Sequence, residues 1–208
     1  MRYHTIIFDI DGTLLDSEYA NLHALQDTLL ERTGRQMPLE SLAFALGIPG
    51  EDALRQLGVE QIPAFLDRWN ERVLCYADRT VLFDGVRQTL DALRAAGWRL
   101  AVVTSRTRAE YRQDMVPLGL DGYFAAVVCA DDTSAHKPDP APLLECLARL
   151  GAGQSEALYV GDSVYDSLCA QRAGVDFALA LWGCRGPRPP AAHLPAAPGD
   201  LLRLAGSR

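Results

Sequence analysis

Five short apolar runs, each ending at polar residues, follow one another along the chain in the pattern of buried parallel strands. They cover residues 5–9, 99–105, 125–129, 157–162 and 177–182. Helical periodicity lies between most of them. In residues 85–96 and 140–150, apolar positions recur every three or four residues, and both segments stop at a glycine. Strands that alternate with helices of this length predict an α/β fold built on a doubly wound parallel sheet.

One long interval interrupts this alternation. Between the first two runs no strand-like segment occurs, and four helical patterns take its place, at residues 17–33, 39–46, 51–57 and 63–77. A helical block of this size predicts a separate lid over the sheet. We therefore expect an α/β catalytic core made of residues 1–15 and 80–208 and an inserted four-helix cap made of residues 16–79. Five of the twelve prolines follow Gly183 and predict irregular structure up to a short helix near residues 200–204.

Composition and charge argue against several classes of protein. The chain has 208 residues, 49% of them hydrophobic, which excludes a disordered protein, and its net charge of −7 disfavours a binder of duplex nucleic acid. No run approaches the roughly 18 apolar residues of a membrane span. The N-terminus lacks the features of a secretory signal, and the five cysteines form no CxxC pair. We expect a cytoplasmic protein, monomeric or homodimeric, without a nucleic-acid or membrane partner.

Polar side chains follow four of the predicted strands at the point where each strand ends, which is where open α/β sheets bind their ligands. In chain order they are Asp9 and Asp11, Thr104 and Ser105, Lys137, and Asp162 and Asp166. Clustered carboxylates repel each other unless a cation lies among them, and aspartate oxygens suit Mg²⁺. Hydroxyls and one ammonium beside this metal predict a site for a dianionic phosphate, which Gly12 lets main-chain N–H groups approach.

These residues resemble the four motifs of the haloacid dehalogenase superfamily. The motifs are Asp9-x-Asp11-Gly12-Thr13, Thr104-Ser105, Lys137-Pro138 and Gly161-Asp162-Ser163-x-x-Asp166, and they occur in the family's order. The resemblance covers nearly the whole chain, including a helical cap inserted after the first strand. It implies that Asp9 attacks phosphorus and carries an aspartyl-phosphate, and that Asp11 protonates the leaving oxygen and then activates water. It also implies that Lys137 balances the charge of Asp9 and the phosphate.

The remaining motif residues take supporting roles in the family. The resemblance implies phosphate binding by Gly12, Thr13, Lys137 and either Thr104 or Ser105. It implies Mg²⁺ binding by Asp9, Asp11 and Asp162. Ser163 and Asp166 are expected behind these ligands, with Asp166 as a partner of Lys137 or of a water on the metal. For Asp166, a simple place in the first turn of a helix is the alternative.

The cap limits the chemistry further, because Lys137 is the only lysine. Phosphonatase-like members need a cap lysine, and mutase relatives have an arginine and a histidine where this chain has Gly50 and Asn21. A dehalogenase would lack Asp11. The pattern is most similar to phosphoglycolate phosphatase-type members, so we expect a Mg²⁺-dependent phosphatase of small phosphorylated metabolites, with phosphoglycolate the best single substrate. A phosphotransferase or sugar-phosphate mutase of the same superfamily and a catalytically silent binding module stay open as alternatives.

Overall fold

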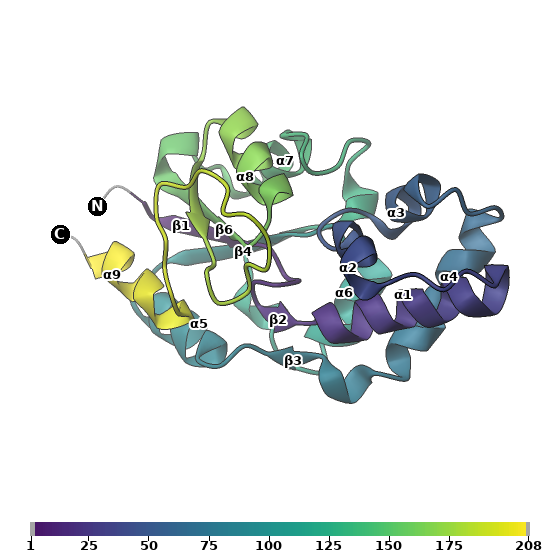
Figure 1. Cartoon of the computed structure of the whole chain (residues 1–208). Coiled ribbons are helices and arrows are strands. Elements are labelled where there is room, and N and C mark those ends of the chain that lie inside the picture. The colour runs from purple at the N-terminus through teal and green to yellow at the C-terminus, as the bar shows by residue number, and fades with distance from the viewer. Residues whose placement is uncertain (1–2, 207–208) are drawn as a thin grey trace.

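A five-stranded parallel sheet forms the centre of the protein, whose computed structural model describes residues 3–206 (Figure 1). Its strands are β1 (Thr5–Phe8), β4 (Arg99–Val103), β5 (Ala126–Val128), β6 (Ala157–Gly161) and β7 (Asp176–Leu179). The strand order is β5-β4-β1-β6-β7, so β1 lies in the middle between β4 and β6. The chain adds β4 and β5 on one side of β1 and then crosses to β6 and β7 on the other. This reversal beside β1 confirms the doubly wound α/β fold.

Helices cover both faces of the sheet because successive side chains of a strand point to opposite faces. On the face that receives Ile6 and Phe8 of β1 lie α5 (Val86–Ala95), α6 (Arg108–Met115) and α9 (Leu201–Gly206). On the face that receives Ile7 lie α7 (Ala141–Leu150) and α8 (Val164–Ala173). The strands are buried on both sides, which explains why they are continuous apolar runs in the sequence.

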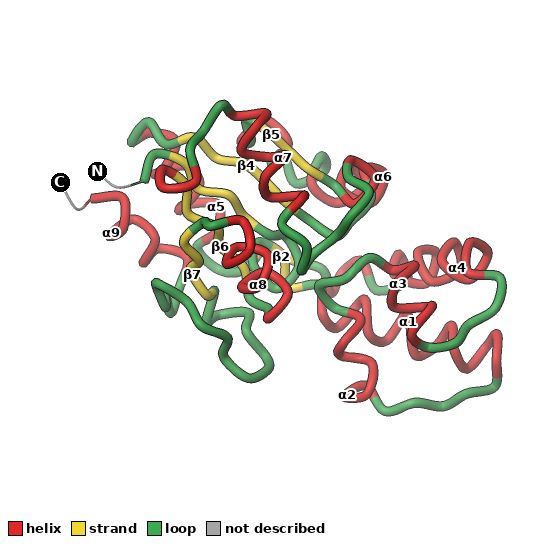
Figure 2. The backbone as a smooth tube through the Cα atoms, turned by 90° about the horizontal axis from the view of Figure 1, so that it is seen from above, coloured by secondary structure: helices red, strands yellow, loops and turns green. Residues whose placement is uncertain are grey.

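The interval without strands forms a group of helices that lies to one side of the sheet (Figures 1 and 2). It consists of α1 (Glu18–Thr33), α2 (Leu39–Leu42), α3 (Gly50–Gln56) and α4 (Ile62–Leu74). These helices share a hydrophobic cluster of their own, which includes Leu25, Leu54, Phe65 and Trp69. The second helix is shorter than predicted. It continues as a 3₁₀ turn at Ala43–Ala45, because Leu46 is extended ahead of Gly47, whose φ is +86°.

Two short strands connect the helical group to the sheet. They are β2 (Leu15–Asp16) and β3 (Val81–Leu82), which pair antiparallel with Leu15 opposite Leu82. Strands of two residues show no periodicity, so the sequence pattern did not predict them. The two chain crossings therefore lie side by side, and we retain residues 16–79 as the proposed extent of the cap.

The last part of the chain departs from the prediction at one point. Strand β7 ends at Leu179 rather than at residue 182, and the chain then turns into an irregular segment that ends at the 3₁₀ turn Pro198–Asp200 and α9. This segment returns to the sheet edge, where Trp182 Nε1 donates to the carbonyl of Thr13 at 2.9 Å. The expected irregular structure and the short terminal helix are confirmed.

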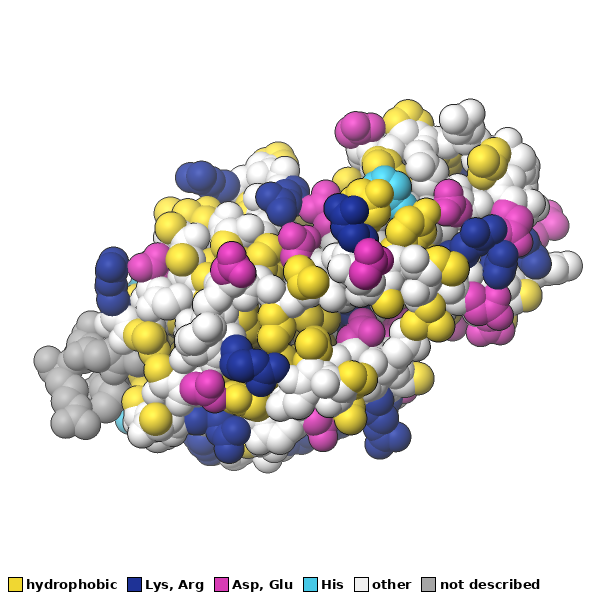
Figure 3. Space-filling model, turned by 90° about the horizontal axis from the view of Figure 1, so that it is seen from below, with side chains coloured by type: hydrophobic (Ala, Val, Ile, Leu, Met, Phe, Trp, Pro, Cys, Tyr) yellow, Lys and Arg dark blue, Asp and Glu magenta, His cyan; other side chains and the backbone are white. Residues whose placement is uncertain are grey.

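The charged side chains on one face of the molecule and the thiols complete the description of the fold. Over the face in Figure 3, Lys and Arg side chains are interspersed with Asp and Glu side chains. None of the helices within residues 3–206 combines the length and apolarity needed to cross a membrane. The cysteines are free thiols: Cys129, Cys146 and Cys169 are buried, Cys184 is half-buried and Cys75 is exposed.

Candidate active site

The loop after β1 places two acids and a glycine at the centre of the sheet edge. It folds back on itself because the carbonyl of Ile10 accepts hydrogen bonds from the N–H groups of residues 13, 14 and 15. Asp9 is buried with 2% of its surface exposed. Gly12 has a φ of +73°, and a Cβ there would lie 2.3 Å from a carboxylate oxygen of Asp162. Only glycine suits this turn, since a side chain would both strain the backbone and collide with the acid.

Lys137 forms the buried electrostatic centre of the site. Its Nζ donates to Asp9 Oδ1 at 2.9 Å and to Asp166 Oδ1 at 2.8 Å, and its side chain is only 1% exposed. Burial by itself would lower the pKa of this ammonium, but Asp166 and Asp9 outweigh burial and raise it. Lys137 therefore stays charged and holds the two carboxylates in place.

Asp166 lies in the first turn of a helix and also contacts Lys137. It occupies the first turn of α8, where Ser163 is the N-cap and the two residues form a capping box. The same carboxylate also accepts from Lys137 and from the Tyr159 hydroxyl, the latter at 2.8 Å. Its other oxygen accepts from the main-chain N–H and the hydroxyl of Ser163. Both oxygens are thus fully engaged by protein donors, which leaves no ordinary acceptor position on Asp166 for a cation.

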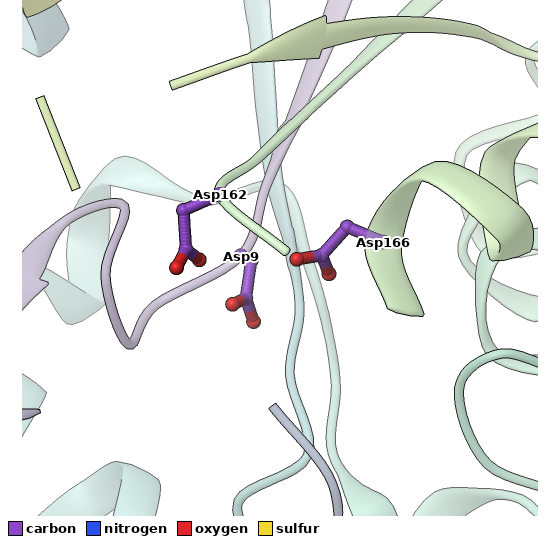
Figure 4. Close-up of side chains that lie close together, drawn as sticks. All are labelled: Asp9, Asp162 and Asp166. Carbon is purple, nitrogen blue, oxygen red and sulfur yellow. The ribbon is translucent and has the colours of Figure 1, made fainter. Parts of the chain in front are cut away.

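The three carboxylates of Asp9, Asp162 and Asp166 gather at one point, with oxygens within 4.8 Å of one another (Figure 4). Burial, reinforced by Asp166 and Asp11 and opposed by Lys137, raises the pKa of Asp9 to about 7. Burial and the charges of Asp166 and Asp9 raise the pKa of Asp162 well above its ordinary value. One ammonium does not neutralise three clustered acids, of which Asp9 and Asp166 are buried and Asp162 is half-buried. A hard divalent cation such as Mg²⁺ fits this oxygen donor set, with Asp9 and Asp162 as the available carboxylates.

This excess of negative charge predicts that Asp162→Asn stabilises the metal-free protein. An acid whose pKa is raised by folding contributes less to stability as pH rises from about 4 through the folded-state pKa. At about pH 8 in EDTA we expect the variant to gain about 1–2 kcal/mol, or roughly 2–8 °C in Tm. The gain should shrink as the pH is lowered, because the raised pKa of Asp162 favours its neutral form in the folded state. Thermal unfolding followed by circular dichroism tests this, and a lower Tm at pH 8 would contradict it.

The hydroxyl residues of the motifs lie at the same edge but make different contacts. Thr104 is buried at the end of β4, beside β1, and its Oγ1 accepts the main-chain N–H of Arg106 at 3.2 Å, so its proton can be donated to an anion. Ser105 Oγ donates to the carbonyl of Gly47 in the cap at 2.9 Å. Thr13 Oγ1 donates to Asp162 Oδ1 at 3.4 Å. Thr104 is therefore the hydroxyl best placed for a phosphate, whereas Ser105 joins core and cap.

A cleft lies between the sheet edge and the helices of the cap. The cap lines it with apolar side chains that include Ile48, Leu66 and Trp69. The core lines it with Asp11, Arg106 and the acids of α6. A second contact closes the cleft at its side, where Asn70 of α4 donates to Glu110 Oε1 at 3.0 Å. Asp11 thus faces a small chamber bounded by both parts of the chain.

The sequence pattern missed three residues that shape this site. Arg106 binds both carboxylate oxygens of Asp11, and Ser17 donates to the same group. Burial would raise the pKa of Asp11, but Arg106 and Ser17 outweigh burial and lower it. Gly183 lies so near Gly12 that a Cβ on Gly183 would lie 1.6 Å from the carbonyl oxygen of Gly12. Arg106 follows the Thr104-Ser105 pair directly, which was the available signal, whereas nothing in the sequence marks Gly183.

Comparisons with known proteins agree with this geometry. The profile of the family described as haloacid dehalogenase-like hydrolase matches residues 6–180. The pyrophosphatase PpaX of Halalkalibacterium halodurans is 30% identical over 191 residues, covering 89% of this chain and 87% of the relative. The phosphoglycolate phosphatase of Xylella fastidiosa is 34% identical over 192 residues, covering 87% and 81%.

A solved structure extends the similarity to the whole fold. It comes from a Lactobacillus plantarum protein provisionally described as a phosphoglycolate phosphatase, is 32% identical and superposes with a TM-score of 0.88. The alignment covers 98% of this chain and all of the other chain. The resemblance drawn from the motifs is thereby confirmed. This chain belongs to the haloacid dehalogenase-like hydrolase family.

Proposed function

We propose that the chain is a Mg²⁺-dependent phosphomonoesterase that works through an aspartyl-phosphate on Asp9. The observation that carries this proposal is the group formed by buried Asp9, buried Lys137 and half-buried Asp162 at the centre of the sheet edge. Such a group pairs a candidate nucleophile with a fixed ammonium and a second carboxylate able to hold a cation. The family membership supports a hydrolase, and the relatives named as phosphatases support phosphoryl chemistry.

In this proposal the ion would be held by the Asp9 and Asp162 carboxylates and the main-chain carbonyl of Asp11. When bound, Mg²⁺ supplies positive charge to the phosphate oxygens and so lowers their repulsion of an attacking carboxylate. Lys137 adds a positive charge of its own beside Asp9, and the Thr104 hydroxyl would donate to a phosphate oxygen. Positioning and charge neutralisation are the main requirements of phosphoryl transfer.

The two chemical steps divide between Asp9 and Asp11. In the first, an Asp9 oxygen forms a bond to phosphorus, the ester P–O bond breaks, and the Asp11 proton passes to the leaving alcohol. In the second, water attacks phosphorus, Asp11 takes the proton of that water, and the bond to Asp9 breaks to release inorganic phosphate. Asp9 and Asp11 return to their starting states, so one ester and one water give one alcohol and one phosphate.

The cleft favours a small substrate. The apolar wall that the cap contributes and the polar wall that the core contributes bound a cleft suited to a small phosphorylated metabolite. The names of the relatives support phosphoglycolate or pyrophosphate, and we propose phosphoglycolate as the best single substrate. We further propose that the protein acts in the cytoplasm as a monomer or homodimer, without nucleic-acid or membrane partners. The acidic net charge and the interspersed charges in Figure 3 support this.

The proposal predicts strict dependence on a divalent cation. With p-nitrophenyl phosphate, we expect EDTA to lower the rate by at least about 100-fold and excess Mg²⁺ to restore it, because a buried acid cluster without a cation repels the phosphate. Inorganic phosphate should form in step with alcohol from phosphoglycolate, sugar phosphates and nucleotides, and pyrophosphate should give two phosphates per molecule. Transfer of phosphate to an acceptor alcohol would instead indicate a phosphotransferase, and absence of Mg²⁺-stimulated hydrolysis would indicate a silent binding module.

A further inference from the structure

Arg106 binds the carboxylate of Asp11, which the proposed chemistry needs as an acid. Its Nε donates to Asp11 Oδ2 at 2.8 Å and its Nη2 to Asp11 Oδ1 at 2.7 Å. Ser17 donates to the same carboxylate, and Arg106 Nη1 also binds Asp114. The Arg106 side chain is only 12% exposed, so this arrangement is enclosed by protein. While a guanidinium binds both of its oxygens, Asp11 is an acceptor and cannot present a proton to a leaving oxygen.

Arg106 also differs in charge from the other charged side chains that line the cleft. Its other charged lining residues are all acids, namely Asp11, Glu110 and Asp114. Among the described residues that line the cleft, Arg106 is the only Lys, Arg or His. A substrate whose leaving part carries a negative charge would therefore be repelled by the charged side chains of this lining except at Arg106.

We propose that Arg106 binds an anionic group on the leaving part of the substrate, either a carboxylate or a second phosphoryl group, and releases Asp11 when it does so. This inference rests on the proposed function and adds the substrate class to it. The planar guanidinium fork matches both kinds of anion and can exchange the two hydrogen bonds to Asp11 for two to the substrate. Asp114 remains bound to Nη1 and provides a pivot, while Ser17 remains as a donor to Asp11.

Selectivity follows from this exchange. A leaving group with a negative charge draws Arg106 away from Asp11, and the freed carboxylate then takes up a proton from solvent, so the acid becomes available only when the correct substrate is present. An ester of similar size with a neutral leaving group leaves the pair of Arg106 and Asp11 intact. We therefore expect the enzyme to prefer phosphoglycolate or pyrophosphate over 2-hydroxyethyl phosphate, which lacks the second anion.

The test measures kcat/KM of wild type, Arg106→Gln and Arg106→Lys on these three substrates with Mg²⁺. We expect the preference for an anionic over the neutral substrate to fall by about 10–100-fold in Arg106→Gln, since a hydrogen bond to a charged group is lost. Arg106→Lys should retain part of the preference, because it keeps the charge but loses the fork. Arg108→Gln is the matched control, since Arg108 binds Asp132 and lies outside the cleft lining. It should keep the wild-type preference.

The substrates also separate the two kinds of anion. A loss confined to phosphoglycolate identifies a carboxylate as the ligand of Arg106, and a loss confined to pyrophosphate identifies a phosphoryl group. A wild type without preference for either anion, or equal losses on all three substrates, would overturn the proposal. Mg²⁺-dependent hydrolysis of p-nitrophenyl phosphate, whose leaving group needs no proton, is measured first. Its absence would count against the proposed function itself, whereas its presence with equal losses counts against Arg106 alone.

Discussion

Replacing Asp9 with Asn is expected to lower kcat for p-nitrophenyl phosphate by about 10⁴-fold or more, the scale seen when a nucleophile is removed. A neutral amide oxygen is a poor nucleophile, and an amide cannot form the aspartyl-phosphate. Asparagine has nearly the same volume as aspartate, and Lys137 keeps its second partner, Asp166, at 2.8 Å. The buried site should therefore keep its shape, and circular dichroism should give an unchanged folded spectrum.

The matched control for Asp9→Asn is Asp131→Asn. Asp131 is also an acid beyond a strand of the same sheet, but it is exposed and accepts the main-chain N–H of Arg108 at 2.9 Å. The same chemical change at this position should leave kcat near the wild-type value. Turnover by a folded Asp9→Asn variant that approaches that of the control would show that Asp9 is not the nucleophile.

Replacing Lys137 with Arg is expected to lower kcat on the order of 10²–10³-fold although the charge is preserved. The Lys137 ammonium is buried and contacts Asp9 and Asp166 at once, at 2.9 and 2.8 Å. A guanidinium is larger and planar, so it cannot place one donor between both acids in this space. The added volume should also cost about 1–3 kcal/mol of folding free energy.

The control for Lys137→Arg is the opposite exchange, Arg149→Lys, at an ion pair outside the site. Arg149 also pairs with two acids, Glu145 and Asp132, but its side chain is 35% exposed and lies on α7. A lysine there should leave kcat unchanged. Stopped assays and thermal unfolding on the same preparations separate a loss of chemistry from a loss of fold. Near-wild-type kcat in Lys137→Arg would contradict the role proposed for a compact ammonium.

The sequence allowed most of the fold and the centre of the site to be predicted because both depend on local patterns. Continuous apolar runs mark strands that are buried on both faces, and the parallel sheet then brings their carboxyl ends together. Asp9, Lys137 and Asp162 could be placed near one another on this basis alone. The predicted helical interval likewise follows from periodicity, since α1 and α4 each present an apolar side to the cluster around Phe65.

The contacts that modify this centre could not be predicted, because they depend on how the cap and the loops are placed. The bond from Ser105 to Gly47 exists only when the cap lies against the core. The approach of Gly183 to Gly12 depends on the path of an irregular, proline-rich segment. The pairing of Arg106 with Asp11 joins residues 95 positions apart and needs the rotamers of both side chains. Periodicity carries no information about such contacts.

The covalent step on Asp9 can be tested directly by acid-quenching the enzyme during turnover and mapping the phosphoryl group by mass spectrometry. An Asp11→Asn variant, in which the second step lacks its base, should accumulate the intermediate when mixed with Mg²⁺ and p-nitrophenyl phosphate, whose leaving group needs no proton from Asp11. We expect a phosphoryl adduct on the peptide that contains Asp9, dependent on Mg²⁺ and absent from Asp9→Asn. Steady turnover with no adduct on this peptide, or with the adduct on another residue, would contradict nucleophilic catalysis by Asp9.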